Sequence, residues 1–431
     1  MTDVRLSTRS EDLLARAAKV IPGATQTASK GPSQWARGIA PMFAERAEGP
    51  FLWDVEGNRY FDLPMALGPV ILGHAHPAVR QAIEESLATG ITFTLPHRLE
   101  TEVAERIVAA VPGAEMVRFG KTGSDATTAA VRAARAITGR EHVAFCGYHG
   151  WHDWHIGATS KRAGVPAAVQ LLTHEFQFGD LKSLDAIIAQ HGDGLAAVIL
   201  EPAGVEEPTP EFLNGLRQRT QDTGALLVFD EILTGFRVAM GGAQERYGTA
   251  ADLVCFGKAL ANGMPLSAVV GPEHHMRAFE EEVFFSGTHG GEVASLAAAR
   301  ATLEVLASEP VHQHLWRLGT MLMEAINRSA RRHGLSGHIR ASGAAPRSVV
   351  TIREPDPAAG LLAKTLIQQE LAKRGVLFNG SNFICYAHTD NYIAAIATAY
   401  DEALERTAEV WPDQIPGALE APPLKPVFSR L

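Results

Sequence analysis

Several sequence features are scarce in this chain of 431 residues, and each absence excludes a class of protein. Only three cysteines occur, Cys146, Cys255 and Cys385, and they lie far apart without the spacing of metal ligands. Such a sparse, odd set argues against a disulfide framework and is typical of a reducing compartment. No stretch approaches the roughly 18 uninterrupted apolar residues that a transmembrane helix needs, so we expect no membrane contact.

Charge of one sign is not concentrated anywhere along the chain. The formal net charge is −9, and the basic residues form no block. Because affinity for nucleic acid comes mainly from Lys and Arg at phosphates, we expect no nucleic-acid partner. The opening residues MTDVRLSTRSEDLLARAAKV are charged throughout and lack the apolar core of a secretory signal. We therefore expect a cytoplasmic protein.

The middle of the chain has the pattern of an α/β domain. Between about residues 77 and 310, helical stretches alternate with short apolar runs such as LAAVIL, ALLVF and DLVCF. Short, nearly continuous apolar runs between helices are typical of parallel strands that are buried on both faces. We predict a large domain over 77–310 with a mostly parallel sheet flanked by helices.

The two ends of the chain have a different pattern. Residues 1–76 read as a helix, an irregular arm and a β-hairpin, FLWDVEGNRYFDL, that turns at Glu56, Gly57 and Asn58. Residues 311–431 are rich in helix and contain the strand-like runs RSVVTIRE and GVLFNGSNFICYAHT. We predict a small α+β domain built from both ends.

Three polar residues follow neighbouring apolar runs where predicted strands end. LAAVIL is followed by Glu201, ALLVF by Asp230, and DLVCFG by Lys258. Each residue alone has a structural interpretation, because acids cap helices and a lysine can extend its ammonium to water. In open α/β sheets, however, ligands bind outside the carboxyl ends of the strands. Together the three residues predict a site with one amine base and two acids.

A glycine turn supplies a fourth element of this predicted site. In RFGKTGSDATTAAVRAARAITGR, Gly123 and Ser124 stand where a short strand passes into an alanine-rich helix. Such a helix start can bind an anion, although capping of the helix by Ser124 or Asp125 is the structural alternative. A phosphate cup, a lysine and an aspartate together suit a cofactor with a phosphate, an aldehyde and a protonated ring nitrogen. Pyridoxal phosphate meets this description.

The stretch FCGYHGWHDWH contains three histidines at three-residue spacing, His149, His152 and His155. Bulky tryptophans stand between them and no carboxylate or cysteine completes a familiar ligand set, so we predict no metal site. Tyr148 follows a predicted strand and can lie against one face of a flat ring.

The chain resembles the class III pyridoxal-phosphate aminotransferases, in particular the branch of glutamate-1-semialdehyde aminomutases. The resemblance is carried in order by YFDLPMALGPVILGHAHPAV, VFDEILTGFR, FGKALANGMPLSAVVG and FSGTHGGEVASLAAA. It implies a fold-type I enzyme, in which the large domain has a seven-stranded sheet. It also implies a homodimer with shared active sites that acts on small-molecule amines and keto compounds.

The resemblance assigns the residues around the cofactor ring. It implies that Lys258 forms the Schiff base with the cofactor and moves protons as general base and acid. Asp230 would be the partner of the pyridine nitrogen. Tyr148 and Ile232 would lie on opposite faces of the ring.

The resemblance also assigns residues around the phosphate. It places Gly123 and Ser124 at the phosphate of the cofactor and Thr288 at the phosphate of the neighbouring subunit. Glu201 would be a further acid near the ring. The same family pattern makes Lys30 and Trp53 the expected substrate contacts.

Three departures from the aminomutase pattern bear on the reaction. Lys30 stands where an arginine would bind the substrate carboxylate, which removes a bidentate contact. The segments HDWHIGATSKRAGVPAA and LFNGSNFICYAHT are shorter than their counterparts, so lid elements that retain an intermediate are missing. We therefore expect a ping-pong transaminase for a non-standard amine, such as a β-amino acid or an amino sugar, and a keto acid or aldehyde. The alternative is glutamate-1-semialdehyde 2,1-aminomutase, and the cofactor residues alone also allow racemisation or decarboxylation.

Overall fold

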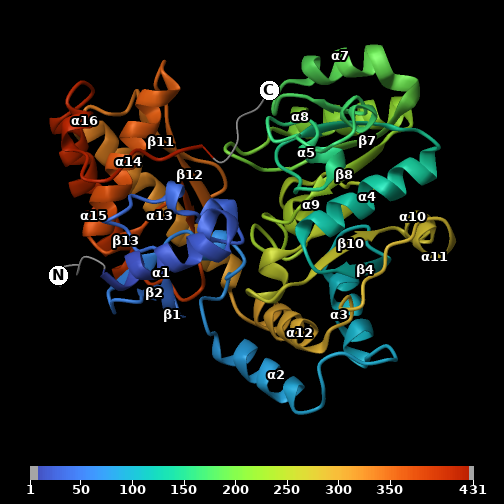
Figure 1. The fold of residues 1–431 in the computed structure, drawn as a ribbon. Coiled ribbons are helices and arrows are strands. Elements are labelled where there is room, and N and C mark those ends of the chain that lie inside the picture. The colour runs from blue at the N-terminus through green and yellow to red at the C-terminus, as the bar shows by residue number, and fades with distance from the viewer. Residues whose placement is uncertain (1–7, 427–431) are drawn as a thin grey trace. The chain divides into compact units, whose positions relative to one another are not determined.

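The computed structural model describes residues 8–426, which divide into two compact units. The large unit consists of residues 68–70 and 77–312, and the small unit of residues 8–67, 71–76 and 313–426. Figure 1 shows the chain coloured from blue to red, with the green and yellow elements in the large unit. Within the described range, no helix combines the length and apolar character that crossing a membrane requires.

The large unit is built on a seven-stranded sheet with the strand order β4-β10-β9-β8-β7-β5-β6. Its strands are β4 (Met116–Gly120), β5 (His142–Cys146), β6 (Thr173–Glu175), β7 (Leu195–Leu200), β8 (Leu226–Asp230), β9 (Leu253–Phe256) and β10 (Ser267–Gly271). Strand β10 pairs antiparallel with β4 and β9, and every other pair is parallel. The predicted mostly parallel, seven-stranded sheet is confirmed.

Helices cover both faces of this sheet, which explains why its strands are apolar throughout. The alanine-rich helix α4 (Gly123–Thr138) packs against β7, β8, β9 and β10, while α7 (Leu181–His191) and α8 (Pro210–Thr223) contact each other and the strands β5, β7 and β8. All residues of β7, β8 and β9 are buried. A strand buried on both faces has no polar side to alternate with, so its sequence is a continuous apolar run.

The remaining helices of the large unit are shorter or lie at its edges. They are α2 (Pro77–Leu87), α3 (Arg98–Ala110), α5 (Asp153–Ile156), α6 (Ala167–Gln170), α9 (Gly242–Tyr247), α10 (Glu273–Met276), α11 (Ala278–Glu281) and α12 (Val293–Ser308). Helix α12 packs against both α2 and α3. Twelve of its residues are buried, which fits its many alanine, leucine and valine side chains.

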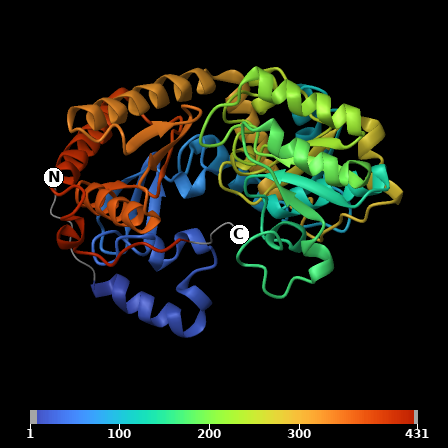
Figure 2. The ribbon, with the colours of Figure 1, turned by 90° about the horizontal axis from the view of Figure 1, so that it is seen from above.

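The small unit combines the two ends of the chain, as the blue and orange-to-red ribbons show together in Figure 2. Its first sheet has the order β1-β2-β3-β13, and its second has the order β11-β12-β14. These strands are β1 (Ala44–Glu48), β2 (Phe51–Asp54), β3 (Arg59–Asp62), β11 (Ile339–Ser342), β12 (Arg347–Ile352), β13 (Val376–Leu377) and β14 (Ser381–Phe383). The antiparallel pairing of β2 with β3 confirms the predicted hairpin, and Gly57 in its turn has φ +89°. The parallel pairing of β13 with β3 joins the two ends.

The helices of this unit are α1 (Thr8–Val20), α13 (Val311–Arg332), α14 (Pro357–Lys373), α15 (Asp390–Glu409) and α16 (Ile415–Ala418). Helix α13 carries Gly319 where the helix passes over the backbone at Ala345, and a Cβ atom at 319 would lie 2.0 Å from the Ala345 carbonyl oxygen. This helix approaches the following turn so closely that only glycine fits.

We expect Gly319→Ala to lower the free energy of unfolding. In an open helix interior the change would stabilise by about 1 kcal/mol, but overpacking typically costs about 1–3 kcal/mol, and here the obstacle is backbone. Urea unfolding measures the effect. The matched control is Gly360→Ala in α14, where the new Cβ would lie 3.8 Å from its nearest neighbour, and it should not destabilise. A Gly319→Ala protein as stable as the parent would contradict this packing.

Candidate active site

The carboxyl ends of three adjacent parallel strands open into one cavity. Glu201 follows β7, Asp230 ends β8, and Lys258 follows β9 after Gly257. These three strands are neighbours in the sheet, and all three side chains line a cavity of about 340 Å³. The structure therefore brings the three strand-end residues together. The cavity volume is in the range of sites for small organic molecules, about 300–1,000 Å³.

Lys258 has an unusual backbone conformation. It is the first residue of the short 3₁₀ helix Lys258–Ala261, and its φ of +42° lies in the left-handed region, which residues with a side chain rarely adopt. Such strain persists only where the surroundings impose it, and it is concentrated at functional sites. Here the fully buried strand β9 precedes the lysine, and the buried residues Ala259 and Leu260 follow it. The lysine thus stands on a fixed support at the mouth of the cavity.

Asp230 is held by a histidine. The carboxylate is 3% exposed, and its Oδ2 atom lies 2.8 Å from Nδ1 of His149, which is itself 2% exposed. The other carboxylate oxygen accepts the N–H of Ile232 at 3.1 Å. The second ring nitrogen of His149 lies 3.1 Å from the carbonyl oxygen of Cys146. Asp230 is therefore fixed in position by contacts on both of its oxygens.

The contacts of His149 constrain the protons of this pair. Because a carbonyl oxygen only accepts, Nε2 of His149 donates to Cys146 and carries a proton. Nδ1 then either donates to an ionised Asp230 or accepts from a protonated one. In both cases the buried pair is neutral overall, which avoids the cost of several kcal/mol for leaving one buried charge without a partner.

The neighbouring acid, Glu231, has a structural role instead. It is fully buried and accepts the N–H of Ala243 at 2.6 Å and the hydroxyl of Thr234 at 2.9 Å. Burial raises the pKa of this carboxyl to about 7. Of the two consecutive acids, only Asp230 lines the cavity.

The start of α4 forms another wall of the cavity. Thr122 caps the helix: its hydroxyl accepts the N–H of Asp125, while the Asp125 carboxylate accepts the N–H of Thr122. Thr122 therefore takes the N-cap position, and Asp125 completes a capping box with it. Of the two residues in the structural alternative, Asp125 takes part in capping and Ser124 does not. The next two residues, Gly123 and Ser124, line the cavity. The first N–H groups of a helix have no partner within it, so this wall is suited to an anion.

Two glycines allow the close packing around this helix start. A Cβ atom at Gly150 would lie 2.3 Å from Oγ of Ser124, and Gly150 has φ +102°. The adjacent Trp151 N–H donates to that Oγ at 3.2 Å. A Cβ at Gly123 would lie 2.6 Å from Cδ1 of Ile232. The predicted phosphate wall and the predicted ring contact are therefore in direct contact with each other.

Tyr148 lies on the cavity and is 47% exposed. Its N–H donates to Oε1 of Glu201 at 3.4 Å, a long hydrogen bond that connects the ends of β5 and β7. Partial burial raises the pKa of the Tyr148 phenol, and the charge of Asp230 adds to the shift. The phenol is therefore neutral near pH 7 and offers an apolar face and a hydroxyl to the cavity.

Three predicted site residues do not line this cavity. Thr288 lies on an exposed segment of the large unit. Lys30 is exposed and lines a hollow within the small unit beside Trp35, and the Trp53 ring has the guanidinium of Arg46 over it at 3.6 Å. The roles expected for these three residues stay predictions.

Sequence reasoning missed several residues of the cavity, above all His149. His149 follows the end of β5, just as Glu201 follows β7 and Lys258 follows β9. Its position after a predicted strand is therefore the sequence signal that could have identified it. In the structure, the three histidine rings of the stretch FCGYHGWHDWH have different partners. His149 contacts Asp230, His152 lies 2.8 Å from the Thr128 hydroxyl, and His155 packs edge-on against Phe145. Lys121 also lines the cavity, with its ammonium 3.0 Å from Glu292.

Comparison with known proteins identifies a family and several similar proteins. A protein-family model described as aminotransferase class-III matches residues 33–389. A protein of Rhodopirellula baltica named glutamate-1-semialdehyde 2,1-aminomutase is 40% identical over 346 residues, or 76% of this chain and 78% of the relative.

Two solved structures are similar over nearly their whole length. The Sphingopyxis sp. MTA144 FumI protein in its PLP internal aldimine form has a TM-score of 0.88 at 29% identity, covering 97% of this chain and 99% of that one. The β-phenylalanine aminotransferase of Variovorax paradoxus has a TM-score of 0.81 at 26% identity, covering 91% and 93%.

We expect His149→Ala to lower the free energy of unfolding of the cofactor-free protein by about 3–5 kcal/mol, because it leaves a buried carboxyl without its partner. The matched control is His152→Ala, which removes one half-buried hydrogen bond to Thr128 and should cost about 0.5–1.5 kcal/mol. Urea unfolding measures both. Adding Asp230→Asn to His149→Ala should restore part of the loss, and an unchanged or larger loss would argue against a charge-based cause.

Proposed function

Because this chain belongs to the class-III aminotransferase family, we propose that it moves amino groups between small amines and carbonyl compounds with pyridoxal phosphate as its cofactor. The observation that carries the proposal is the convergence of Lys258, Asp230 and the start of α4 on one cavity. The resemblance to this family that the sequence predicts is confirmed.

The residues around the cavity fit this cofactor. Pyridoxal phosphate supplies an aldehyde that takes up an amine and a protonated ring that withdraws electrons from the amine-bearing carbon. The cavity offers an amine on Lys258, a carboxylate on Asp230 and the N–H groups at the start of α4. These three groups are complementary to an aldehyde, a ring nitrogen and a phosphate. Ile232, which packs closely against Gly123, adds an apolar surface to the cavity.

Each residue then has a definite task. Nζ of Lys258 would hold the aldehyde of the cofactor and, when freed by the substrate amine, would act as general base at the amine-bearing carbon of the substrate and as general acid at the carbon of the cofactor. Asp230 holds a proton at the ring nitrogen, and His149 keeps the carboxylate oriented and paired. Gly123 and Ser124 bind the phosphate.

The faces of the cofactor ring are expected to be enclosed by side chains of different character. Tyr148 and Ile232 both line the cavity, and we propose that they exclude water from opposite faces. Glu201, which the Tyr148 N–H contacts, is proposed to orient the tyrosine segment.

For the overall reaction, the comparisons favour isomerisation of glutamate-1-semialdehyde. The Rhodopirellula baltica protein with the name glutamate-1-semialdehyde 2,1-aminomutase is 40% identical over the aligned residues, which make up 76% of this chain. This reaction is the alternative to transamination in the prediction from the sequence. We propose it as the first candidate for the overall reaction.

A transaminase for a non-standard amine is the second candidate, and specific observations favour it. Two of them are departures of the sequence from the aminomutase pattern: Lys30 stands where that pattern has an arginine for a carboxylate, and the segment between α5 and α6 is shorter than the resemblance predicts. A solved structure with closely similar geometry is named for transamination of a β-amino acid. A site without a retaining lid releases its keto product instead of returning it.

We further propose that the protein is a homodimer. Thr288 is exposed, and close to it in sequence the side chain of Phe284 is 77% exposed. In the proposed dimer, Thr288 reaches the phosphate of the neighbouring subunit.

The cofactor spectrum distinguishes the two overall reactions. Glutamate, alanine, β-amino acids, simple amines and 4,5-diaminovalerate are added singly to the holoenzyme. For the aminomutase we expect a response to 4,5-diaminovalerate and conversion of glutamate-1-semialdehyde without any added keto acid. For the transaminase we expect a β-amino acid or another donor to convert the cofactor to its amine form, with one keto product released. A protein that binds no pyridoxal phosphate and answers no donor would refute the proposed function.

We expect Lys258→Ala to abolish turnover while some cofactor stays bound through its phosphate. The matched control is Lys121→Ala, the other lysine of the cavity, whose ammonium is paired with Glu292. Reduction of the holoenzyme with borohydride, followed by peptide mass mapping, should locate the cofactor on Lys258. Labelling of Lys121, or full activity of Lys258→Ala, would overturn the assignment.

A further inference from the structure

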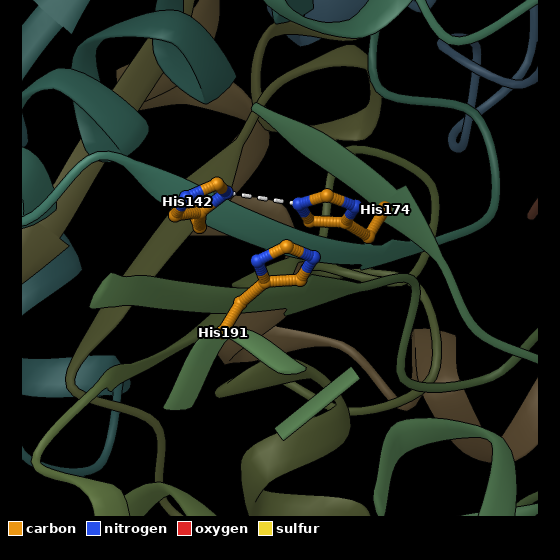
Figure 3. Close-up of side chains that lie close together, drawn as sticks. All are labelled: His142, His174 and His191. Atoms are coloured by element: carbon orange, nitrogen blue, oxygen red, sulfur yellow. Dashed lines mark hydrogen bonds between the residues drawn. The ribbon is translucent and has the colours of Figure 1, made fainter. Parts of the chain in front are cut away.

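Three histidines far apart in sequence meet at the opposite end of β5 from the cavity. His142 begins β5, His174 is the middle residue of β6, and His191 ends α7. Figure 3 shows the three rings gathered together, with a hydrogen bond between His142 and His174. Nδ1 of His142 lies 3.0 Å from Nε2 of His174. The His191 ring stacks near both, with centroids 4.4 Å from His142 and 4.2 Å from His174.

The topology of the sheet explains why these rings meet. Strands β5 and β6 are parallel neighbours in which Ala144 is paired with His174, so His142 and His174 are offset by two residues on one face. Side chains alternate along a strand, and Val143 and Phe145 pack on the α4 side within the core. The even residues therefore face the other side, where α7 contacts β5. His191, at the end of this helix, completes the group.

One nitrogen atom from each ring can be chosen so that all three lie within 4.8 Å of one another. A tetrahedral metal ion with bonds of about 2.0–2.1 Å to imidazole requires nitrogens roughly 3.4 Å apart. The nitrogens must therefore approach one another by only a small distance. Because all three side chains are half-buried, modest rotations about their side-chain bonds bring the nitrogens to that separation.

The protonation of the rings is compatible with a cation. The hydrogen bond between His142 and His174 joins two ring nitrogens, so one of the two must be an unprotonated acceptor. His191 ends α7, where the partial negative charge of the helix terminus favours a cation.

We propose that His142, His174 and His191 bind one divalent transition-metal ion, of which Zn²⁺ is the probe. Three neutral imidazoles are a recognised ligand set for Zn²⁺, and the remaining position is left to water. The ion joins β5, β6 and α7, so it stabilises the edge of the sheet. No metal site is predicted from the sequence, but that prediction rests on the spacing of His149, His152 and His155. The three histidines proposed here are far apart in the sequence.

The metal site is independent of the proposed function. His142 begins β5, whereas Tyr148 and His149 follow its other end, and a strand of five residues spans roughly 15 Å. No residue of the group lines the cavity with Lys258. Amino transfer can therefore fail while metal binding is found, and the reverse.

The test uses holoenzyme without a polyhistidine tag, freed of metal by a chelator and then dialysed against ZnCl₂. We expect one tightly bound Zn²⁺ per chain and a higher melting temperature in its presence. His174→Ala and His191→Ala should each weaken binding by more than roughly tenfold, because loss of even an outer partner of a site costs about ten- to hundredfold. Both variants should lose the melting shift.

The matched control is His275→Ala, which removes a half-buried histidine of α10 whose ring centroid lies 4.1 Å from that of His274. It should bind Zn²⁺ like the parent. Co²⁺ in place of Zn²⁺ should give the visible bands of a low-coordinate site in the parent and not in His174→Ala. Absence of tight binding in the parent, binding kept in both cluster variants, or loss in His275→Ala would each overturn the proposal.

Discussion

The arrangement of this protein depends on parallel strands that are buried on both faces. Strands β5, β7, β8 and β9 run in one direction between α4 on one side and α7 and α8 on the other. The helices remove the strand backbones and side chains from water, so polar residues are tolerated only where the strands end. All carboxyl ends then lie at one edge, and the polar residues that follow them are forced into a common space. The cavity is a consequence of this burial, and the opposite edge gathers the residues that begin the strands.

Burial also explains the pair of Asp230 and His149. An isolated ionised carboxylate beneath the cavity would cost several kcal/mol, far more than a typical net hydrogen bond of about 1 kcal/mol recovers. A ring held between Asp230 and the Cys146 carbonyl gives the carboxylate a partner without exposing it to water. The acid can thus line the cavity and still be almost wholly buried. The same constraint explains why Glu231, directly adjacent, is satisfied by Thr234 and Ala243 on the far side.

Close packing gives the site its precision. Gly123 and Gly150 are positions where any side chain would overlap Ile232 or Ser124, so the helix start, the loop after β5 and the residue after Glu231 are held together by contact. The strained backbone at Lys258 is maintained by buried neighbours on both sides. A lysine on such a support loses little conformational freedom when it binds a ligand, which is the advantage of a rigid scaffold for the proposed chemistry.

The α/β class, the hairpin at Gly57 and the strand-end positions of Glu201, Asp230 and Lys258 could all be predicted from the amino-acid sequence. These features depend on local patterns, namely apolar runs, turn residues and helix starts, which the chain carries in contiguous segments. Long segments with the family pattern likewise identified the family from the sequence.

Which side chains contact one another depends on the folded chain and could not be predicted from local patterns. The partnership of His149 with Asp230 spans 81 positions, and the gathering of His142, His174 and His191 depends on the register of β5 with β6 and on where α7 ends. Neither can be read from spacing, because the order of strands in the sheet differs from their order in the chain. The surroundings of Ser124 likewise depend on tertiary structure: its hydroxyl accepts the N–H of Trp151 and lies so close to Gly150 that a Cβ atom there would overlap it. Local chemistry is set by neighbours in sequence, whereas a site is set by neighbours in space.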